Sequence, residues 1–470
     1  MNITDTFVET LYTLKCRPLP EEVVLEARKC MMDEIGTMLA GAKLLGGQLS
    51  CYLDCFTGED ATVVGLGRRA ALQNAALCNG ISGHAYDFDD GHRFSTVHLG
   101  SAVIPPVLAV AEKNGLSMGD AIRGIVIGYE AGIRLGRCIQ PSHRACGFHS
   151  SGTAGAIAAA MGVAAALDFD KAQFKATLAA ACSCAGGINE MMENVSTMKP
   201  FNVGRAAHDG ITAAYIAKAG FQGPYDPMLG TFGFLRTACE VYDASVLSLE
   251  TDDSYHICGG YHKPYASCRH THGAVYAALR AVSDNGIPLQ DIADISVRMY
   301  GQGVKGHDHK AVPGMVAGKM STPFCIGLAL KTGKIGIASF TEEYLRDPEI
   351  LRLTELVTVA ADPEMTAWVP KKRAAAAVVT TKDGSQYAYH ADFAPGEPEL
   401  PMTLHDFRDK LRELALAAGR TEEEIDDLAA MLLHFDGSVS ELMMNLSCWI
   451  APICNNKGRG YCLSLYCWCR

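Results

Sequence analysis

Alanine and glycine dominate three long stretches in the first half of the chain, and this pattern constrains the fold more than any other feature. The stretches cover residues 152–167, 170–184 and 206–219, and they hold almost no strand-forming pattern. Small side chains let the axes of neighbouring helices approach closely. A further helix is predicted after Pro20, where apolar residues recur at steps of three and four. These observations predict a tight, all-helical domain.

The pattern changes after about Leu289. Ile295, Val297 and Met299 alternate with polar residues, which is typical of a half-buried strand. The segments 375–381 and 386–389 flank Lys-Asp-Gly-Ser, a combination that predicts a hairpin. Helix start signals return at Thr403 and Thr421, each followed three residues later by an acidic residue. A smaller α+β unit inserted between helical segments is therefore expected.

The predicted fold class is mainly α, with a large all-helical domain and an inserted, smaller α+β lid domain. We expect helical structure over 1–269, the α+β lid over 270–395, and a return to the helical domain over 396–446. The remaining stretch, 447–470, is a cysteine-rich tail of unknown structure. Its five cysteines form no C-x-x-C pair and have no histidine beside them, which argues against a metal site there.

The overall composition excludes several classes of protein. A formal charge of −11 argues against a general nucleic-acid binder, which needs a basic face. The longest apolar run, 153–167, is too short and too rich in Ala and Gly to span a bilayer. Residues 1–14 resemble an amphipathic helix rather than a secretory leader, and many of the 18 cysteines lie in helical patterns. We expect a cytoplasmic protein that binds neither nucleic acid nor membrane.

The densest chemistry lies in residues 84–98, which hold three carboxylates and three imidazoles. Tyr86 and Phe88 alternate with the acids, so the segment is expected to be at least half buried rather than a solvated acidic turn. A buried carboxylate is costly unless it is paired, and its pKa is shifted. Such groups are candidates for acid–base catalysis.

Two Lys-Pro-aromatic segments, at Lys199 and Lys263, predict a cationic pocket for carboxylates or phosphates. Arg269 and His272 follow the second segment closely. Basic residues on surface loops are the alternative interpretation. His149 precedes an Ala/Gly-rich helix, and taken alone it reads as an ordinary residue at a helix N-terminus.

Other motifs carry less weight. Residues 65–70 fit the G-x-G-x-x-A pattern of dinucleotide sites, but no alternation of strands and helices follows. There is no G-x-S-x-G motif of a serine hydrolase. Acidic residues and His92 in the 84–98 segment have the chemistry of metal ligands, yet an alternating loop defines no coordination geometry. We predict no metal.

Several segments, taken in order, resemble the MmgE/PrpD family, which includes 2-methylcitrate dehydratase, cis-aconitate decarboxylase and iminodisuccinate epimerase. The resemblance covers about residues 5–445. It is carried by His84-Ala-Tyr-Asp87-Phe-Asp-Asp90, His98-Leu-Gly-Ser101, Gly128-Tyr-Glu130, Gly147-Phe-His149, Lys199-Pro-Phe201, Gly204-Arg-Ala-Ala207, Lys263-Pro-Tyr265 and Cys268-Arg269. The resemblance implies a helical domain with a smaller α+β lid, a homodimer, no required metal or cofactor, and small di- or tricarboxylate substrates.

Carried over position by position, the resemblance implies a set of site residues. The catalytic candidates are Asp87, His98, His149, Lys199 and Lys263. The substrate-binding candidates are Arg205, Arg269, His272, His92 and Gly91. The chain departs from the family where Gly91 replaces a common Thr, Leu99 a frequent Pro, and Phe324 a Tyr of the decarboxylase type. Loss of two hydroxyls changes which substrate a pocket selects.

The resemblance implies a cofactor-independent lyase in which lysines bind carboxylates and an imidazole moves a proton. We expect elimination of water from a 2-methylcitrate-like hydroxy acid first. Decarboxylation of a cis-aconitate-like acid, or epimerisation of an iminodisuccinate-like one, is the alternative. A non-catalytic carboxylate-binding relative is the hypothesis from a different class.

Overall fold

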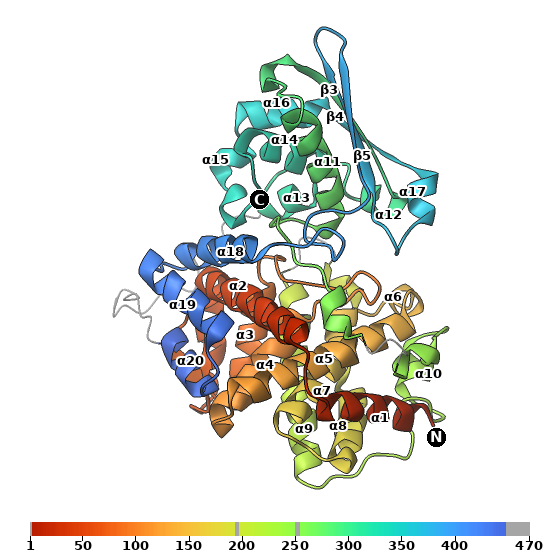
Figure 1. The fold of residues 1–470 in the computed structure, drawn as a ribbon, viewed down its shortest axis with the longest axis vertical. Coiled ribbons are helices and arrows are strands. Elements are labelled where there is room, and N and C mark those ends of the chain that lie inside the picture. The colour runs from red at the N-terminus through yellow and green to blue at the C-terminus, as the bar shows by residue number, and fades with distance from the viewer. Residues whose placement is uncertain (1, 193–196, 250–253, 448–470) are drawn as a thin grey trace.

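The computed structural model describes residues 2–192, 197–249 and 254–447. Figure 1 shows two parts, a larger helical part at the bottom and a smaller part with a twisted sheet at the top. The described chain is mainly helical, as predicted, and its sheets are small. None of the described helices is both long and apolar enough to cross a membrane.

The larger part is a bundle built from the N-terminal half of the chain. Side chains cap several helix starts: Asn2 accepts from the Asp5 amide, and Ser117 and Asp170 form capping boxes. Its helices are α1 (Ile3–Cys16), α2 (Glu21–Leu53), α3 (Leu72–His84), α4 (Gly100–Asn114), α5 (Met118–Ile139), α6 (Ser142–Ala145), α7 (Ser150–Ala166), α8 (Lys171–Cys184), α9 (Lys199–Lys218) and α10 (Phe234–Ala238). The G-x-G-x-x-A segment lies in a small hairpin of β1 (Ala61–Val63) and β2 (Arg68–Ala70).

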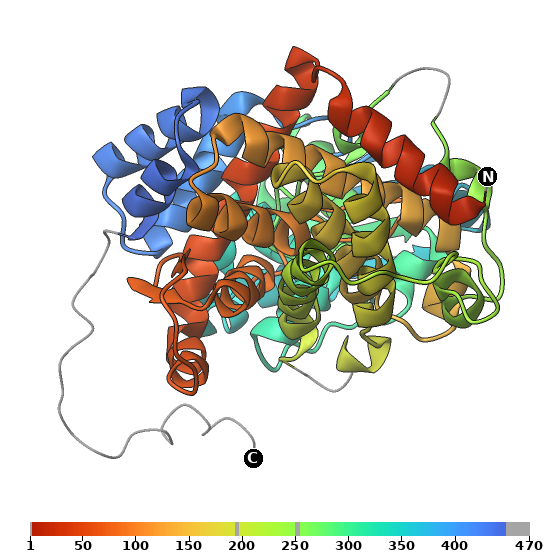
Figure 2. The same ribbon diagram turned by 90° about the horizontal axis from the view of Figure 1, so that it is seen from below.

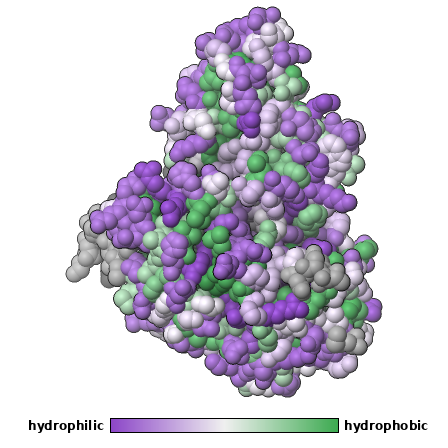
Figure 3. Space-filling model, in the orientation of Figure 1, coloured by the Kyte–Doolittle hydropathy of each residue, from purple (hydrophilic) through white to green (hydrophobic). Residues whose placement is uncertain are grey.

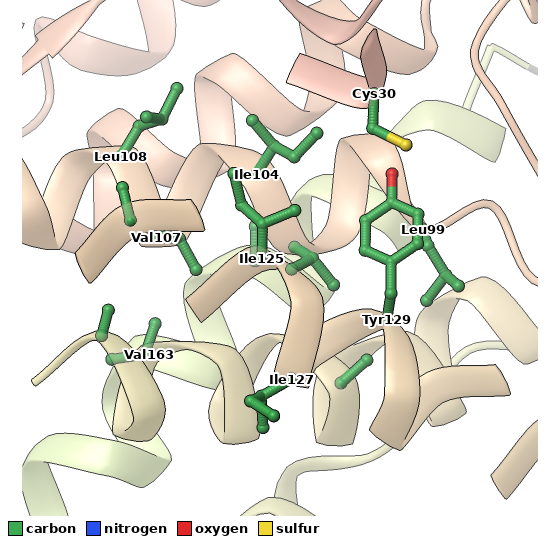
Figure 4. Packing of buried hydrophobic residues seen from close by; sticks show 14 of the residues in the cluster. Cys30, Leu99, Ile104, Val107, Leu108, Ile125, Ile127, Tyr129 and Val163 are labelled. Atoms are coloured by element: carbon green, nitrogen blue, oxygen red, sulfur yellow. The ribbon is translucent and has the colours of Figure 1, made fainter. Parts of the chain in front are cut away.

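Small residues bring α5, α7 and α9 together, as the alanine and glycine pattern predicts. A Cβ added to Gly210 of α9 would lie 2.4 Å from the Cβ of Ala159 in α7, and one added to Gly124 of α5 would lie 2.8 Å from the Cβ of Ala166 in α7. Both distances are closer than carbon atoms can approach, so these positions require glycine. In Figure 4, Val107 of α4, Ile125 of α5 and Val163 of α7 lie among the packed side chains of this core.

The smaller part contains a four-stranded sheet in the order β4-β3-β5-β6. Strand β3 (Ile292–Met299) pairs parallel with β4 (Val357–Ala361) and antiparallel with β5 (Ala375–Thr381). The predicted hairpin is confirmed, because β5 pairs antiparallel with β6 (Gln386–Ala391). The helices of this part are α11 (His272–Ser283), α12 (Gly301–Val304), α13 (Met315–Met320), α14 (Thr322–Thr332), α15 (Glu342–Leu345), α16 (Pro348–Leu356) and α17 (Pro363–Ala367).

The chain then packs again on the first core. Helices α18 (Leu404–Ala417), α19 (Glu422–His434) and α20 (Val439–Ser447) contribute to the same apolar cluster as α1–α5. Figure 2 shows these blue helices grouped beside the N-terminal helices at one edge of the bundle. The capping boxes predicted at Thr403 and Thr421 are confirmed.

The second part has an apolar core of its own, formed by α11, α14 and the sheet. On the face drawn in Figure 3, polar side chains predominate at the tip of this second part. Apolar side chains gather in patches over the larger part. The domain boundaries and a lid role for this part stay predictions. The cysteine-rich tail, from residue 448 on, lies outside the described residues.

Candidate active site

Asp87 lies at the centre of the candidate site, in the loop between α3 and α4. Its φ of 54° is in the left-handed region, which aspartate tolerates better than most residues. The ammonium of Lys263 donates to the Asp87 backbone carbonyl and, at 2.9 Å, to Oδ1. These contacts hold the loop in its unusual backbone conformation. A residue with a positive φ stores local strain, and such residues are common at functional sites.

Two lysines converge on the same carboxylate oxygen. Lys199, the first residue of α9, places Nζ 2.8 Å from Asp87 Oδ1, and Lys263 reaches it from the segment before α11. Burial raises the pKa of Asp87, but the two ammonium groups outweigh it and hold the pKa well below its usual value. The structure therefore brings three predicted catalytic residues together, with Asp87 ionised between two cations.

His98 is a neutral imidazole with a defined tautomer. Its Nδ1 lies 2.7 Å from the backbone carbonyl of Asp90, which can only accept, so Nδ1 carries the proton. Burial lowers the pKa of His98 to about 3, although Asp89 opposes this shift. The ring is consequently uncharged at neutral pH and has its free lone pair on Nε2, the arrangement that a general base needs.

His149 has the opposite tautomer. It precedes α7, and the amide nitrogen of Asn202 lies 3.3 Å from its Nδ1. An amide N–H donates, so Nδ1 is the acceptor and Nε2 carries the proton. Burial and the nearby charge of Lys199 lower the pKa of His149 well below its usual value. His149 is therefore a neutral donor at Nε2.

A buried pair that was not among the predicted site residues, His84 and Asp89, lies beside His98. His84 Nδ1 lies 2.8 Å from Asp89 Oδ2, and the ring centres of His84 and His98 are 4.8 Å apart. The Ser101 hydroxyl contacts both Asp89 and Glu34. Burial raises the pKa of Glu34 well above its usual value, so Glu34 can donate to Ser101, which then donates to Asp89. Residue type pointed to His84 and Asp89, but no sequence signal pointed to Glu34.

Lys319 is a third lysine of the site, and it was not among the residues predicted from the sequence. It comes from α13 in the smaller part, and its Nζ donates to the Tyr86 backbone carbonyl at 3.1 Å. Burial lowers the pKa of Lys319 to about 8, and the nearby charges of Lys263 and Lys199 act in the same direction, while Asp87 opposes them. No Lys-Pro-aromatic pattern marks this lysine, so only the packing of the two parts reveals it.

The other predicted residues already have partners within the protein. Arg205 contacts Asp209 at 2.7 Å and the carbonyl of Cys184 at 3.2 Å. Arg269 pairs with Glu397 and lies over the ring of Tyr261. His272 Nε2 lies 3.2 Å from the Ser267 carbonyl, and His92 Nδ1 lies 3.1 Å from the Ser95 hydroxyl. These contacts hold secondary structure and loops in place, and substrate binding by these residues stays a prediction.

Two departures from the family pattern have a structural context. Gly91 exchanges backbone hydrogen bonds with Tyr261, and a Cβ added to Gly91 would lie 2.5 Å from the Tyr261 hydroxyl. The phenol of Tyr261 thus fills the space that a threonine side chain would need. Phe324 is buried in the apolar core of the smaller part, where its ring centre lies 6.2 Å from that of Phe340.

The charges at the centre of the site favour an anion over a metal ion. His84, Asp87, Asp89 and His98 offer ligand atoms within 4.8 Å of one another. However, Asp87 Oδ1 already accepts from two ammonium groups, which would repel a divalent cation at that oxygen. The same cations attract the carboxylates of a small organic acid.

The helical bundle and the small α+β part together place lysines and neutral imidazoles around one aspartate, an arrangement whose groups can bind an anion and move a proton. The chain belongs to the MmgE/PrpD family: its N-terminal domain model matches residues 5–246 and its C-terminal domain model matches residues 265–433. This confirms the resemblance drawn from the motifs.

Cis-aconitate decarboxylases are among the similar proteins. The human enzyme is 23% identical over 97% of this chain and 98% of its own length. The enzyme of Aspergillus terreus is 23% identical over 92% of this chain and 93% of its own length. A cis-aconitate decarboxylase-like protein of Aspergillus oryzae, oryM, is 27% identical, but the match covers 47% of this chain and 48% of that protein.

Proposed function

We propose that this protein is a cofactor-independent lyase that acts on a small di- or tricarboxylate. The observation that carries the proposal is the meeting of Lys199, Lys263 and Lys319 around Asp87, beside two neutral imidazoles in opposite tautomers. Cations alone would describe an anion-binding site. Cations beside a proton acceptor and a proton donor are what proton transfer next to a carboxylate requires.

The lysines would bind the substrate carboxylates and stabilise the charge that develops in the reaction. Breaking a bond at the carbon next to a carboxylate moves an electron pair onto that carboxylate. Ammonium groups fixed in a partly buried site stabilise this additional charge more than they stabilise the ground state, which lowers the barrier. Asp87 holds Lys199 and Lys263 in position before the substrate arrives.

The two tautomers assign the proton transfers. His98, with the lone pair on Nε2, would remove a proton from carbon, and His149, with the proton on Nε2, would protonate the substrate. In a decarboxylation, the electron pair of the broken C–C bond stays on the substrate and takes the Nε2 proton of His149. The imidazolate that this leaves lies near the ammonium of Lys199, which would return a proton to it. In a dehydration, His98 takes the carbon-bound proton and His149 protonates the departing hydroxyl.

Decarboxylation of a cis-aconitate-like acid is the first candidate, supported by the full-length likeness to proteins named for that activity. Dehydration of a 2-methylcitrate-like hydroxy acid is the second candidate. It is favoured by the free lone pair of His98, because a decarboxylation needs an acid but no base. A homodimer in the cytoplasm stays a prediction.

A turnover screen in deuterated water tests the proposal. Purified protein, with and without chelator, is incubated separately with cis-aconitate, 2-methylcitrate, citrate and iminodisuccinate, and products are followed by NMR. Loss of carbon dioxide from cis-aconitate supports the first candidate, and an alkene formed from a hydroxy acid supports the second. Deuterium exchange without conversion shows a working base on the wrong substrate. No conversion and no exchange in folded protein contradicts the proposal and favours a non-catalytic relative.

The pKa of Lys319 predicts the pH dependence of turnover. Lys319 is a cation below about pH 8 and neutral above it, so kcat/KM should fall as the pH rises through about 8. In Lys319→Arg the fall should move to higher pH, because a guanidinium stays charged. Initial rates across about pH 6 to 10 measure both profiles. If the Arg variant and the wild type decline at the same pH, Lys319 is not the group that titrates.

A further inference from the structure

A second group of titratable side chains, none of them in contact with Asp87, lies on the face of α2 that meets His262, the residue before Lys263. Glu26 and Cys30 are four residues apart on this helix, so they lie one above the other on the same face. His262 faces them, with Nε2 3.0 Å from Glu26 Oε1. The carboxylate, thiol and imidazole each offer an atom, and these three atoms lie within 4.8 Å of one another.

We propose that Glu26, Cys30 and His262 form a binding site for a thiophilic divalent cation of the zinc type. Thiolate, imidazole and carboxylate are the ligands that zinc takes, and it takes them in tetrahedral geometry. Three ligands leave one position for water. Zinc–ligand distances of about 2.0 to 2.3 Å let a single ion reach three atoms that lie within 4.8 Å of one another once their side chains close around it.

The surroundings of the three ligands support this assignment. Asp33 Oδ2 lies 3.4 Å from His262 Nδ1, so a carboxylate orients the ring and leaves Nε2 for the ion. Metal-bound histidines have this kind of partner. Lys410 contacts the other oxygen of Asp33 at 2.6 Å, and Lys29 contacts Glu26 Oε2 at 3.0 Å. Each carboxylate is therefore anchored by a lysine and keeps one oxygen for the site.

Protons occupy the cluster in the absence of the ion. Burial raises the pKa of the Cys30 thiol to about 12. Burial lowers the pKa of His262, but Asp33, Cys30 and Glu26 outweigh it and hold that pKa well above its usual value. Binding of the ion releases one proton from the thiol and one from Nε2 of the imidazolium. A dication replaces two protons, so the net charge of the buried cluster does not change.

The cluster lies directly behind the candidate active site. His262 precedes Lys263 in the chain, so an ion here ties α2 to the segment that carries this lysine. Figure 4 shows the hydroxyl of Tyr129 pointing toward the sulfur of Cys30. The same hydroxyl donates to Asp90 Oδ2 at 2.6 Å, and Asp90 Oδ1 accepts from the Gly100 amide at the start of α4. The ion would stabilise the site loop from behind.

Metal titration of the full chain tests the site. Protein stripped with chelator and dialysed is titrated with Co²⁺ and with Zn²⁺, recording bound metal per chain, proton release and thiolate-to-cobalt absorption. Because the chain has 18 cysteines, the comparison of Cys30→Ser with Cys78→Ser, an equally buried cysteine of α3, is decisive. We expect one equivalent bound, about two protons released, and loss of the absorption band only in Cys30→Ser.

Two further measurements test the site even if the Cys30→Ser variant does not fold. Glu26→Gln removes a partly exposed ligand and should weaken Zn²⁺ binding by about tenfold or more. X-ray absorption of the zinc-loaded wild type should show sulfur at about 2.3 Å. Less than one tightly bound equivalent in the wild type, or an unchanged band in folded Cys30→Ser, overturns the proposal. His262 is then an imidazolium held between two carboxylates.

Discussion

Replacing His98 with glutamine is expected to lower kcat/KM by about 10² to 10⁴, the usual contribution of a general base. Glutamine can keep a hydrogen bond to the Asp90 carbonyl through its amide, but it has no basic nitrogen at the place of Nε2. The fold should survive, because the packing around His98 is largely kept. Steady-state rates on the best substrate of the screen measure the loss.

Deuterium exchange tests directly whether His98 removes the proton from carbon. His98→Gln should abolish exchange at the carbon next to the carboxylate, since the base is missing. His405→Gln, at an exposed position of α18, is the matched control and should exchange at the wild-type rate. A loss below tenfold together with normal exchange would assign the proton abstraction to another group, with the buried His84 next in line.

Replacing Lys199 with alanine is expected to lower kcat/KM by about 10² to 10³, as for removal of one oxyanion donor. Lys199 is the better test of the cationic pocket, because its side chain is partly exposed whereas that of Lys263 is buried. Removing one partner of a buried ion pair costs about 3 to 5 kcal/mol of folding free energy, which would confuse catalysis with stability in a Lys263 variant.

Two further variants complete this experiment. Lys171→Ala is the matched control, because Lys171 is also the first residue of a helix, α8, and pairs with an exposed Glu9. It should retain wild-type kcat/KM. Lys199→Arg keeps the charge and should recover part of the lost activity. If Lys199→Ala loses less than tenfold while its melting temperature is unchanged, Lys199 is not part of the pocket.

Much of the fold was predictable because its signals are local. Capping boxes at Ser117, Thr403 and Thr421 satisfy amide groups within one turn of helix. The hairpin at 382–385 depends on a short run of turn residues between two strands. A dinucleotide site at residues 65–70 was rejected because no alternation of strands and helices follows that segment. In the structure the segment lies in a two-stranded hairpin.

The residue types of the candidate site were predictable from the sequence, but the full set of its residues was not. Asp87, Lys199 and Lys263 were identified from motifs, and the structure joins them at one carboxylate oxygen. Lys319 escaped because it stands in no such motif and comes from the other part of the molecule. Glu34 escaped because a single acid within a long helix looks like a solvated residue until its burial is known.

The sequence by itself determined the family, the helices with their caps, and the presence of acids, imidazoles and lysines in short motifs. These properties depend on residue types and on spacings of a few positions. Only the tertiary structure decided that two lysines, 112 and 176 residues further along the chain, both contact Asp87. It also decided which ring nitrogen of His98 and of His149 carries the proton. Protonation follows from burial and from the partner that each atom contacts, and both arise only when distant segments pack together.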